Sequence, residues 1–174
     1  NYLFLPFDTK QFLPSYQLTK PIKVCHSTTN RHYKGSNTII PICEKLEDEG
    51  KIEFKLIENM SHNKALKLKS ECDIFIDQVH NRGGWGYGMN SIEALSMGLC
   101  CLTELIPEYV EFIPDHPFIN INGENLYSTL IEILDNPQKI HHHKKMGREW
   151  VVNKHDLTYT AEKLYEFYHE KSWL

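Results

Sequence analysis

The sequence lacks a Cys-x-x-Cys pair, which is the spacing that zinc sites and thioredoxin-like redox sites use. Its five cysteines are an odd number and cannot all pair within one chain. Most of them lie in apolar runs, as small buried hydrophobic residues do in a reducing cytosol. We therefore expect a cytoplasmic protein with buried thiols at Cys25, Cys43, Cys72, Cys100 and Cys101.

Long apolar runs and an excess of basic residues are also missing. No run approaches the ~20 apolar residues of a membrane-spanning helix. The formal net charge of −4 gives no electrostatic reason to expect nucleic acid as a partner. The local cluster of Lys64, Lys67 and Lys69 is typical of a solvated helix face. Three consecutive histidines at 141–143 would point in directions about 100° apart on a helix, so they predict exposed surface and no metal site.

What the chain does contain is an alternation of strand and helix patterns. With 174 residues, 41% of them hydrophobic, it is long enough for one compact domain. Helical spacing predicts a helix over residues 38–49, with Pro41 in its first turn if Thr38 or a neighbour is the cap. The alternation predicts an α/β fold, a Rossmann-like parallel sheet flanked by helices, with ligands above the carboxyl ends of the strands. Apolar runs predict the strands at residues 22–27, 51–58, 73–79, 99–103 and 117–121.

A glycine-rich loop at residues 81–90 joins the strand at 73–79 to a short helix. The start of a helix directs free N–H groups and a positive dipole end at whatever lies above the strand, so an anion is the expected guest. The loop is no P-loop, because no Lys-Ser or Lys-Thr pair follows its glycines. As a dinucleotide fingerprint it lacks the third glycine, although Glu104 at the end of the next strand is placed to meet a ribose. A nicotinamide-dependent oxidoreductase domain and a plain loop therefore stay open as alternatives.

Glu93 has two interpretations. If Asn90 is the N-cap, Glu93 is the third helical residue and closes a capping box. Alternatively, a carboxylate beside a phosphate-binding loop accepts the two hydroxyls of a ribose.

The segment Trp-Gly-Tyr-Gly-Met-Asn-Ser-Ile-Glu-Ala-Leu-Ser-Met-Gly at residues 85–98 resembles the donor-site signature of the group 1 family of retaining GT-B glycosyltransferases. The resemblance implies the C-terminal half of a GT-B fold. Glu93 matches the family's second Glu, which binds the ribose of the nucleotide sugar, whereas Trp85 stands where the family has its first Glu, the contact to the transferred sugar. A catalytically degenerate nucleotide-binding module is therefore a further alternative. The donor-binding residues implied in this segment are Gly86, Tyr87, Gly88, Met89, Asn90, Ser91 and Glu93.

Arg31 and Lys34 lie in a strand-to-helix loop at the same edge of the sheet as the glycine-rich loop. Two cations and a helix start suit a diphosphate leaving group, whose charge grows as the sugar–phosphate bond breaks. The family places an Arg and a Lys-Gly in this loop, and Lys34-Gly35 matches it. Weaker candidates for contacts to the donor are Asn59, Met60, His80, Trp85 and Glu104.

The resemblance also implies a partner domain. Asp8, Phe12 and Pro14 have the spacing that the family uses just after its first domain, so residues 1–20 are expected to form an interdomain segment and residues 21–174 the nucleotide-sugar-binding domain. An acceptor-binding domain would precede them. The full-length protein would transfer a sugar, with retention of configuration, to a glycan, lipid or small molecule. Peripheral membrane association of the full-length protein is compatible with this resemblance. The substrate would be a UDP- or GDP-linked sugar. No metal, cofactor or catalytic residue is assigned to this chain, which alone should transfer nothing.

Overall fold

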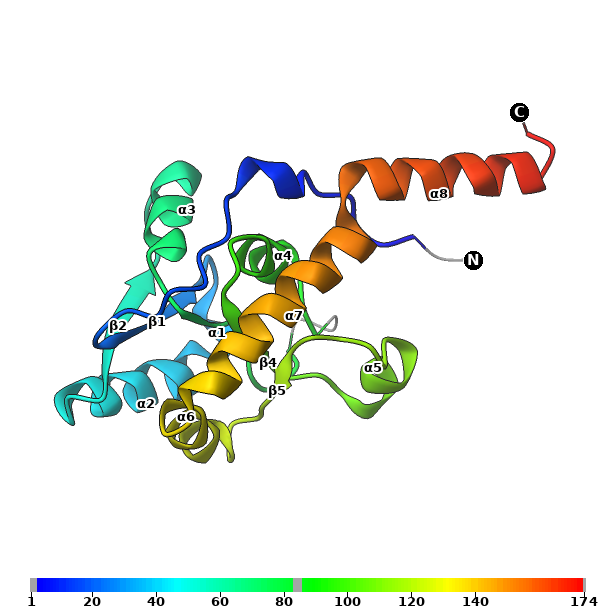
Figure 1. Cartoon of the computed structure of the whole chain (residues 1–174). Coiled ribbons are helices and arrows are strands. Elements are labelled where there is room, and N and C mark those ends of the chain that lie inside the picture. The colour runs from blue at the N-terminus through cyan, green and yellow to red at the C-terminus, as the bar shows by residue number, and fades with distance from the viewer. Residues whose placement is uncertain (1–2, 83–85, 174) are drawn as a thin grey trace.

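The computed structural model describes residues 3–82 and 86–173 and has the predicted α/β fold (Figure 1). Five strands form one parallel sheet in the order β2-β1-β3-β4-β5. Each strand lies within the range that the sequence predicted. Their bounds are β1 Ile22–Ser27, β2 Ile52–Ile57, β3 Ile74–Ile76, β4 Cys100–Thr103 and β5 Ile119–Asn120.

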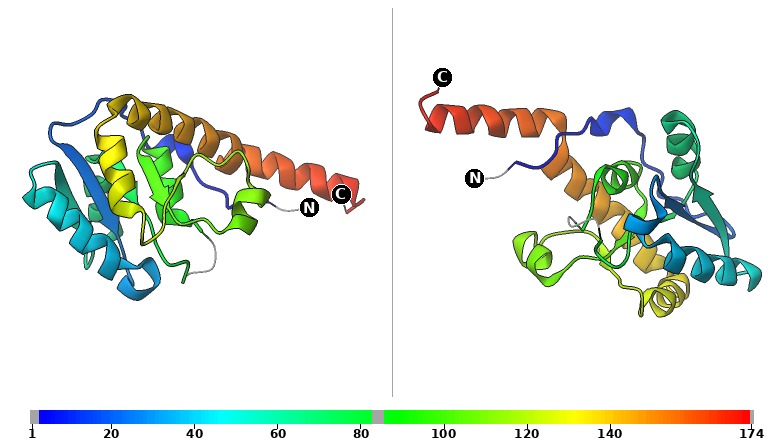
Figure 2. Two further views of the ribbon diagram at one scale, coloured as in Figure 1. Left: turned by 90° about the horizontal axis from the view of Figure 1, so that it is seen from below. Right: turned by 180° about the vertical axis from the view of Figure 1, so that it is seen from behind.

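Helices cover both faces of this sheet (Figures 1 and 2). On one face α3 and α4 pack together, and on the other α2 packs with α6, while α7 runs diagonally over β4 and touches both α4 and α6. The helices are α1 Arg31–Lys34, α2 Ser36–Asp48, α3 His62–Ser70, α4 Met89–Ser96, α5 Pro107–Phe112, α6 Leu126–Leu134, α7 Pro137–His155 and α8 Leu157–Glu170, with a 3-10 turn η1 at Thr9–Gln11.

The central strand β3 shows how the core forms. Ile74 and Ile76 point to the face covered by α2 and α6, whereas Phe75 points to the face covered by α3 and α4. All three side chains are fully buried, as expected for a parallel strand covered on both faces. At the edge of the sheet, the charged Glu53 and Lys55 of β2 stay partly exposed and pair with each other. The alternating pattern of that strand therefore reflects its edge position.

The strand order creates a topological switch point between β1 and β3. The chain leaves β1 toward β2 on one side and later enters β3 on the other, so the loops after β1 and β3 diverge above the sheet. Ligands of open α/β sheets bind in the crevice at such a point, outside the carboxyl ends of the strands. In this chain the two loops carry Lys34 and Asp77, respectively.

The prediction for the start of the α2 helix was wrong. Gly35 is its N-cap, not Thr38, and Pro41 therefore lies at the sixth helical position, beyond the first turn. The reason is the close approach of this turn to the segment that follows β3. Gly35 has φ +66°, and a Cβ built on it would lie 2.5 Å from Cγ2 of Val79 and 2.6 Å from the carbonyl oxygen of Val79. A side chain at this position would push the Lys34 loop away from the sheet.

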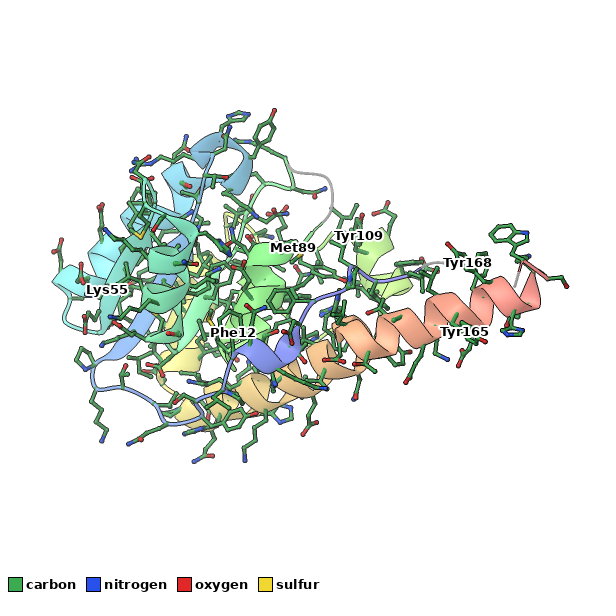
Figure 3. The ribbon with its side chains drawn as sticks, turned by 90° about the horizontal axis from the view of Figure 1, so that it is seen from above. Phe12, Lys55, Met89, Tyr109, Tyr165 and Tyr168 are labelled. Atoms are coloured by element: carbon green, nitrogen blue, oxygen red, sulfur yellow. The ribbon has the colours of Figure 1, made fainter. Side chains whose placement is uncertain are left out.

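The N-terminal segment packs against the junction of α7 and α8. The N–H of Phe7 donates to the carbonyl of His155, and the N–H of Leu157 donates to the carbonyl of Phe7. From this junction α8 extends beyond the body of the domain, as Figure 3 shows for the part that carries Tyr165 and Tyr168. Within the described ranges, no helix combines the length and apolarity that crossing a membrane requires.

The histidine run lies on α7, but of its three members His142 alone is exposed, so the prediction of an exposed run was wrong for His141 and His143. His143 is partly buried, and its Nδ1 lies 3.0 Å from the carbonyl oxygen of Pro117. Burial is the main cause of its lowered pKa. This histidine therefore ties α7 to the segment that leads into β5.

Candidate functional site

The α4 helix begins two residues earlier than expected, and this changes which backbone groups are free. Gly88 is the N-cap, so Asn90 is not. The N–H of Ser91 donates to the carbonyl of Gly88 at 2.9 Å, so it is not available to a ligand as the sequence had suggested. The amides of Met89 and Asn90 are the first two of the helix, and α-helical geometry gives them no acceptor within the helix. They are the donors that α4 offers to an anion.

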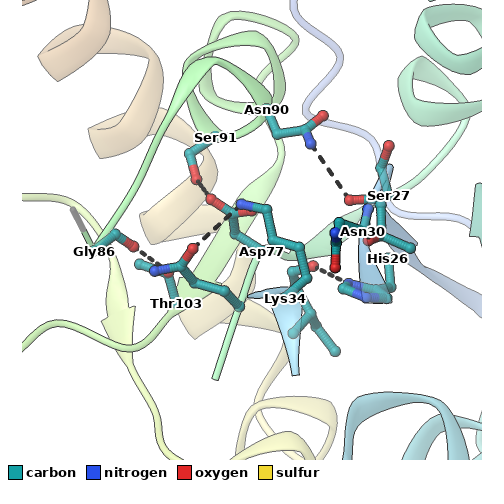
Figure 4. Close-up of polar contacts among 12 residues, drawn as sticks. His26, Ser27, Asn30, Lys34, Asp77, Gly86, Asn90, Ser91 and Thr103 are labelled. Carbon is teal, nitrogen blue, oxygen red and sulfur yellow. Dashed lines mark hydrogen bonds and ion pairs between the residues drawn. The ribbon is translucent and has the colours of Figure 1, made fainter. Parts of the chain in front are cut away.

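Lys34 and α4 meet through Asp77, which follows β3 (Figure 4). The ammonium group of Lys34 donates to Oδ1 of Asp77 and, at 3.3 Å, to Oε1 of Gln78. The hydroxyl of Ser91 donates to Oδ2 of Asp77 at 2.6 Å. Asp77 and Ser91 are fully buried, whereas the Lys34 side chain is 21% exposed. One carboxylate thus fixes the basic loop and the first turn of α4 relative to each other.

Glu93 does not close a capping box, because it is the fifth residue of α4 and not the third. Its Oε2 accepts a hydrogen bond from Nζ of Lys69 at 2.6 Å. Its Oε1 lies 3.4 Å from Nε2 of the exposed His62. The Glu93 side chain is only 7% exposed, yet it lines a cavity of about 530 Å³ between α3, α4 and the ends of β1 and β2.

The prediction that Lys69 belongs to a solvated helix face was wrong. Its side chain is 1% exposed, and its ammonium group also donates to Oδ1 of Asn90 at 2.8 Å. The amide nitrogen of Asn90 in turn donates to the carbonyl of Ser27 at 3.4 Å. Helical spacing could have revealed this position, because Lys69 is four residues from the partly buried Ala65 and shares its face, whereas Lys67 points away.

The same cavity contains the two weaker candidates from the turn after β2. Asn59, which has φ +54°, and Met60, which is 37% exposed, both line it. A second hollow of about 320 Å³ shares Asn59 and Glu58 with it and is lined by Arg31. The two hollows therefore form one depression over the carboxyl ends of β1 and β2.

Arg31 lies at the rim of this depression and is bound by a carboxylate. Its Nε and one terminal nitrogen donate to the two oxygens of Glu58, at 2.9 and 2.5 Å. These hydrogen bonds raise the pKa of Arg31 and lower the pKa of Glu58. Arg31 and Lys34 thus belong to the same short helix, but their side chains end on different acidic residues.

Other candidates have structural partners. The side chain of Tyr87 packs among Phe118, Trp150 and His155, with ring centroids 5.0, 5.8 and 5.8 Å away, so it is committed to the core. The carbonyl of the buried Gly86 accepts from the hydroxyl of Thr103 at 2.5 Å.

Glu104, the residue on which the oxidoreductase alternative depends, also has a local partner. Its carboxylate accepts from the backbone N–H of His80 at 2.6 Å, and Nε2 of His80 lies 2.8 Å from the hydroxyl of Thr38. Glu104 and His80 thus hold the loop after β3 in place, which is a structural role for both residues. Trp85 lies outside the described residues.

The cysteines offer no reactive group at this site. All five are free and buried, as predicted. Burial raises the pKa of Cys43 and of Cys100 to about 12, so neither forms a thiolate at neutral pH. The chemistry of the depression is therefore that of carboxylate, ammonium and backbone amide groups.

Neither family models nor curated proteins match the sequence. Solved structures do match the fold. Anabaena HepE in complex with UDP and glucose superposes with a TM-score of 0.68 at 11% identity, over 95% of this chain and 55% of HepE. Sucrose-phosphate synthase from Thermosynechococcus elongatus gives 0.66 at 15% identity, over 95% of this chain and 51% of the synthase.

A third match is itself a single domain. The C-terminal domain of LpcC, a group 1 glycosyl transferase from Francisella tularensis, gives a TM-score of 0.61 at 14% identity, over 87% of this chain and 99% of that domain. The chain therefore spans about half the length of the first two proteins and nearly all of the third. The predicted fold, the C-terminal half of a GT-B glycosyltransferase, is confirmed.

Proposed function

We propose that this chain is the donor-binding domain of a retaining glycosyltransferase that uses a UDP- or GDP-linked sugar. The observation that carries the proposal is the position of Glu93. It is a buried carboxylate with one oxygen committed to Lys69 and the other directed at a cavity beside the start of α4. The GT-B fold supports the same proposal.

In this proposal each part of the donor has a place. The ribose hydroxyls donate hydrogen bonds to Glu93. The diphosphate oxygens accept hydrogen bonds from the backbone N–H groups of Met89 and Asn90, and the base lies against the turn at Asn59 and Met60. Lys34 reaches the diphosphate with the third N–H of its ammonium group, since among the described residues Asp77 and Gln78 accept two of the three. As the sugar–phosphate bond breaks, these donors stabilise the charge on the leaving diphosphate.

Arg31 contacts the diphosphate in this proposal only under one condition. Its guanidinium group is held by Glu58 at the rim, and it reaches a phosphate only if that exposed ion pair opens. Exposed pairs of this kind are weak and are screened by salt. We therefore assign the larger phosphate contribution to Lys34.

Transfer needs a second domain, which we propose to be an acceptor-binding domain in the same polypeptide. The chain matches about half of HepE and of sucrose-phosphate synthase, and in this proposal the other half of the cleft comes from that domain. The chain alone should therefore bind a nucleoside diphosphate but transfer no sugar.

Calorimetry with UDP, GDP and ADP tests the proposal. We expect at least one of them to bind, and Glu93→Gln to weaken binding about tenfold or more, because a hydrogen bond to a charged group contributes about 1.5–3 kcal/mol. Glu71→Gln, at an exposed carboxylate that ends α3, is the matched control and should bind like the unaltered chain. Binding of NADH without competition from any of the three nucleotides would instead favour the oxidoreductase alternative.

A further inference from the structure

We propose that Lys69 is a positioning residue that turns Glu93 toward the ribose of the nucleotide; this inference rests on the proposed function above. Lys69 comes from α3, and no motif in the sequence drew attention to it. Its ammonium group donates to Oε2 of Glu93 at 2.6 Å.

The contacts of Lys69 hold its ammonium group in one place. It donates to Oε2 of Glu93 and to Oδ1 of Asn90, both on α4, and it lies 5.1 Å above the ring centre of Phe75 in β3. These two hydrogen bonds and the aromatic neighbour leave the ammonium group little freedom, and its side chain is only 1% exposed. A fixed ammonium group fixes the carboxylate that it binds.

The consequence appears at the other oxygen of Glu93. Because Lys69 takes Oε2 from the buried side, Oε1 is left toward the cavity, where its neighbour is the 68% exposed His62 at 3.4 Å. A carboxylate has about four lone-pair sites, so Oε1 retains room for two ribose hydroxyls. Without Lys69, the Glu93 side chain could turn to another rotamer and lose this orientation.

Stability alone does not explain a buried pair of this kind. Taking an ammonium group and a carboxylate out of water is costly, and well-packed apolar residues of similar volume are often as stable or more stable. The Lys69–Glu93 pair lines a cavity, from which a ligand can reach the carboxylate. The expected role is therefore orientation of the carboxylate.

The experiment measures how well the chain discriminates a ribose from a ribose without hydroxyls. The affinities of UDP, GDP and ADP are each compared with the affinity of the 2′,3′-dideoxy counterpart, for the unaltered chain and for Lys69→Met. We expect the unaltered chain to prefer the ribonucleotide about tenfold or more, and Lys69→Met to reduce that preference to about one. Lys144→Met, which removes the other buried lysine with a carboxylate partner, is the matched control and should keep the preference.

The outcomes separate the two proposals. If the unaltered chain binds none of the nucleotides, the proposed function is wrong and Lys69 has no ribose to serve. If the unaltered chain discriminates and Lys69→Met discriminates equally well, the proposed function stands and the role of Lys69 is wrong.

A second variant keeps the test available if Lys69→Met does not fold. The double variant Lys69→Met/Glu93→Gln removes both charges and so leaves no unpaired buried ion. Since Lys69 acts through Glu93, the double variant should bind each nucleotide within about twofold of Glu93→Gln alone. A further loss of affinity would contradict the positioning role.

Discussion

Two buried lysine–carboxylate pairs lie at opposite ends of the strands, one near their amino ends and one near their carboxyl ends. They differ in what surrounds the carboxylate. At the amino edge, Oδ1 of Asp73 accepts from Lys144 at 3.1 Å, while Oδ2 accepts from the hydroxyl of Thr19 at 2.5 Å and from the N–H groups of Thr19 and Lys23. At the carboxyl edge, Glu93 has Lys69 on one oxygen and the rim residue His62 near the other.

The difference distinguishes a structural carboxylate from one that can bind a ligand. Asp73 is saturated by donors from its own chain and ties the segment before β1 to α7. Glu93 retains acceptor capacity on the side of a cavity. Burial and pairing with lysine are the same in both cases, so the number of donors already present decides which carboxylate can receive a ribose.

The largest effect that we expect from testing this comparison is a loss of stability at the saturated pair. Asp73→Ala leaves Lys144 buried without a counter-charge, which should lower the free energy of unfolding by about 3–5 kcal/mol. Urea denaturation measures this as a lower midpoint with an unchanged slope. In the folded fraction, the affinity for a nucleoside diphosphate should not change.

Asp48→Ala, at the exposed end of α2, is the control for Asp73→Ala. It should change the free energy of unfolding by no more than about 0.5 kcal/mol. If Asp73→Ala were equally mild, the saturated pair would not hold the amino edge together. The contrast with Glu93 would then have no basis.

An intermediate effect is expected at Lys34. Its partner Asp77 is bound by donors of the chain, as Asp73 is, but Lys34 itself is proposed to contact the ligand, as Glu93 is. Lys34→Met removes one donor from Asp77, but the hydroxyl of Ser91 still binds that carboxylate. We expect UDP affinity to fall about tenfold through loss of the charged phosphate contact, with a weaker salt dependence of binding. The affinity of uridine, which has no phosphate, should stay the same. An equal loss for uridine would mean that Lys34 supports the fold and not the diphosphate.

A further effect concerns the dependence of stability on pH. His26, buried at the end of β1, and His155, at the end of α7, have lowered pKa values, mainly because burial disfavours their charged forms. The unfolded chain therefore takes up protons near pH 6.5 that the folded chain refuses, and lowering the pH from 7.5 to 5.5 should reduce stability. Each histidine lowers the free energy of unfolding by at most about 1.4 kcal/mol per pH unit. Urea midpoints that stay level or rise on acidification would contradict this.

The sequence predicted the sheet well because parallel strands buried on both faces are short apolar runs that need no tertiary information to recognise. It failed where a helix start depends on contacts far along the chain. Gly35 begins α2 because a Cβ at this position would clash with Val79, in the segment after β3. Gly88 begins α4 although Asn90 is the better capping residue by type. At Gly35 backbone packing overrode the local capping preference, whereas a Cβ on Gly88 would meet nothing within 4 Å, so packing does not explain that helix start.

The residues expected to bind the donor stay predictions, and the contacts that hold them in place were not foreseen. Lys34 and Ser91 both bind Asp77, and Asn90 and Glu93 both bind Lys69; of these four, Asn90 and Glu93 line the larger cavity. Lys69 was overlooked because three nearby lysines were treated as one helix face, although their spacing puts one of them against the core. Nothing in the sequence indicated that Tyr87 would join the aromatic cluster at Trp150.

The most direct test of the donor site is a crystal structure of this chain with UDP, or with GDP or ADP if one of them binds more tightly. We predict that both ribose hydroxyls lie within about 2.5–3.0 Å of the Glu93 carboxylate, with the diphosphate at the amides of Met89 and Asn90. A nucleotide whose ribose lies elsewhere, for example beside Glu104, with the Glu93 carboxylate free, would contradict the proposed site.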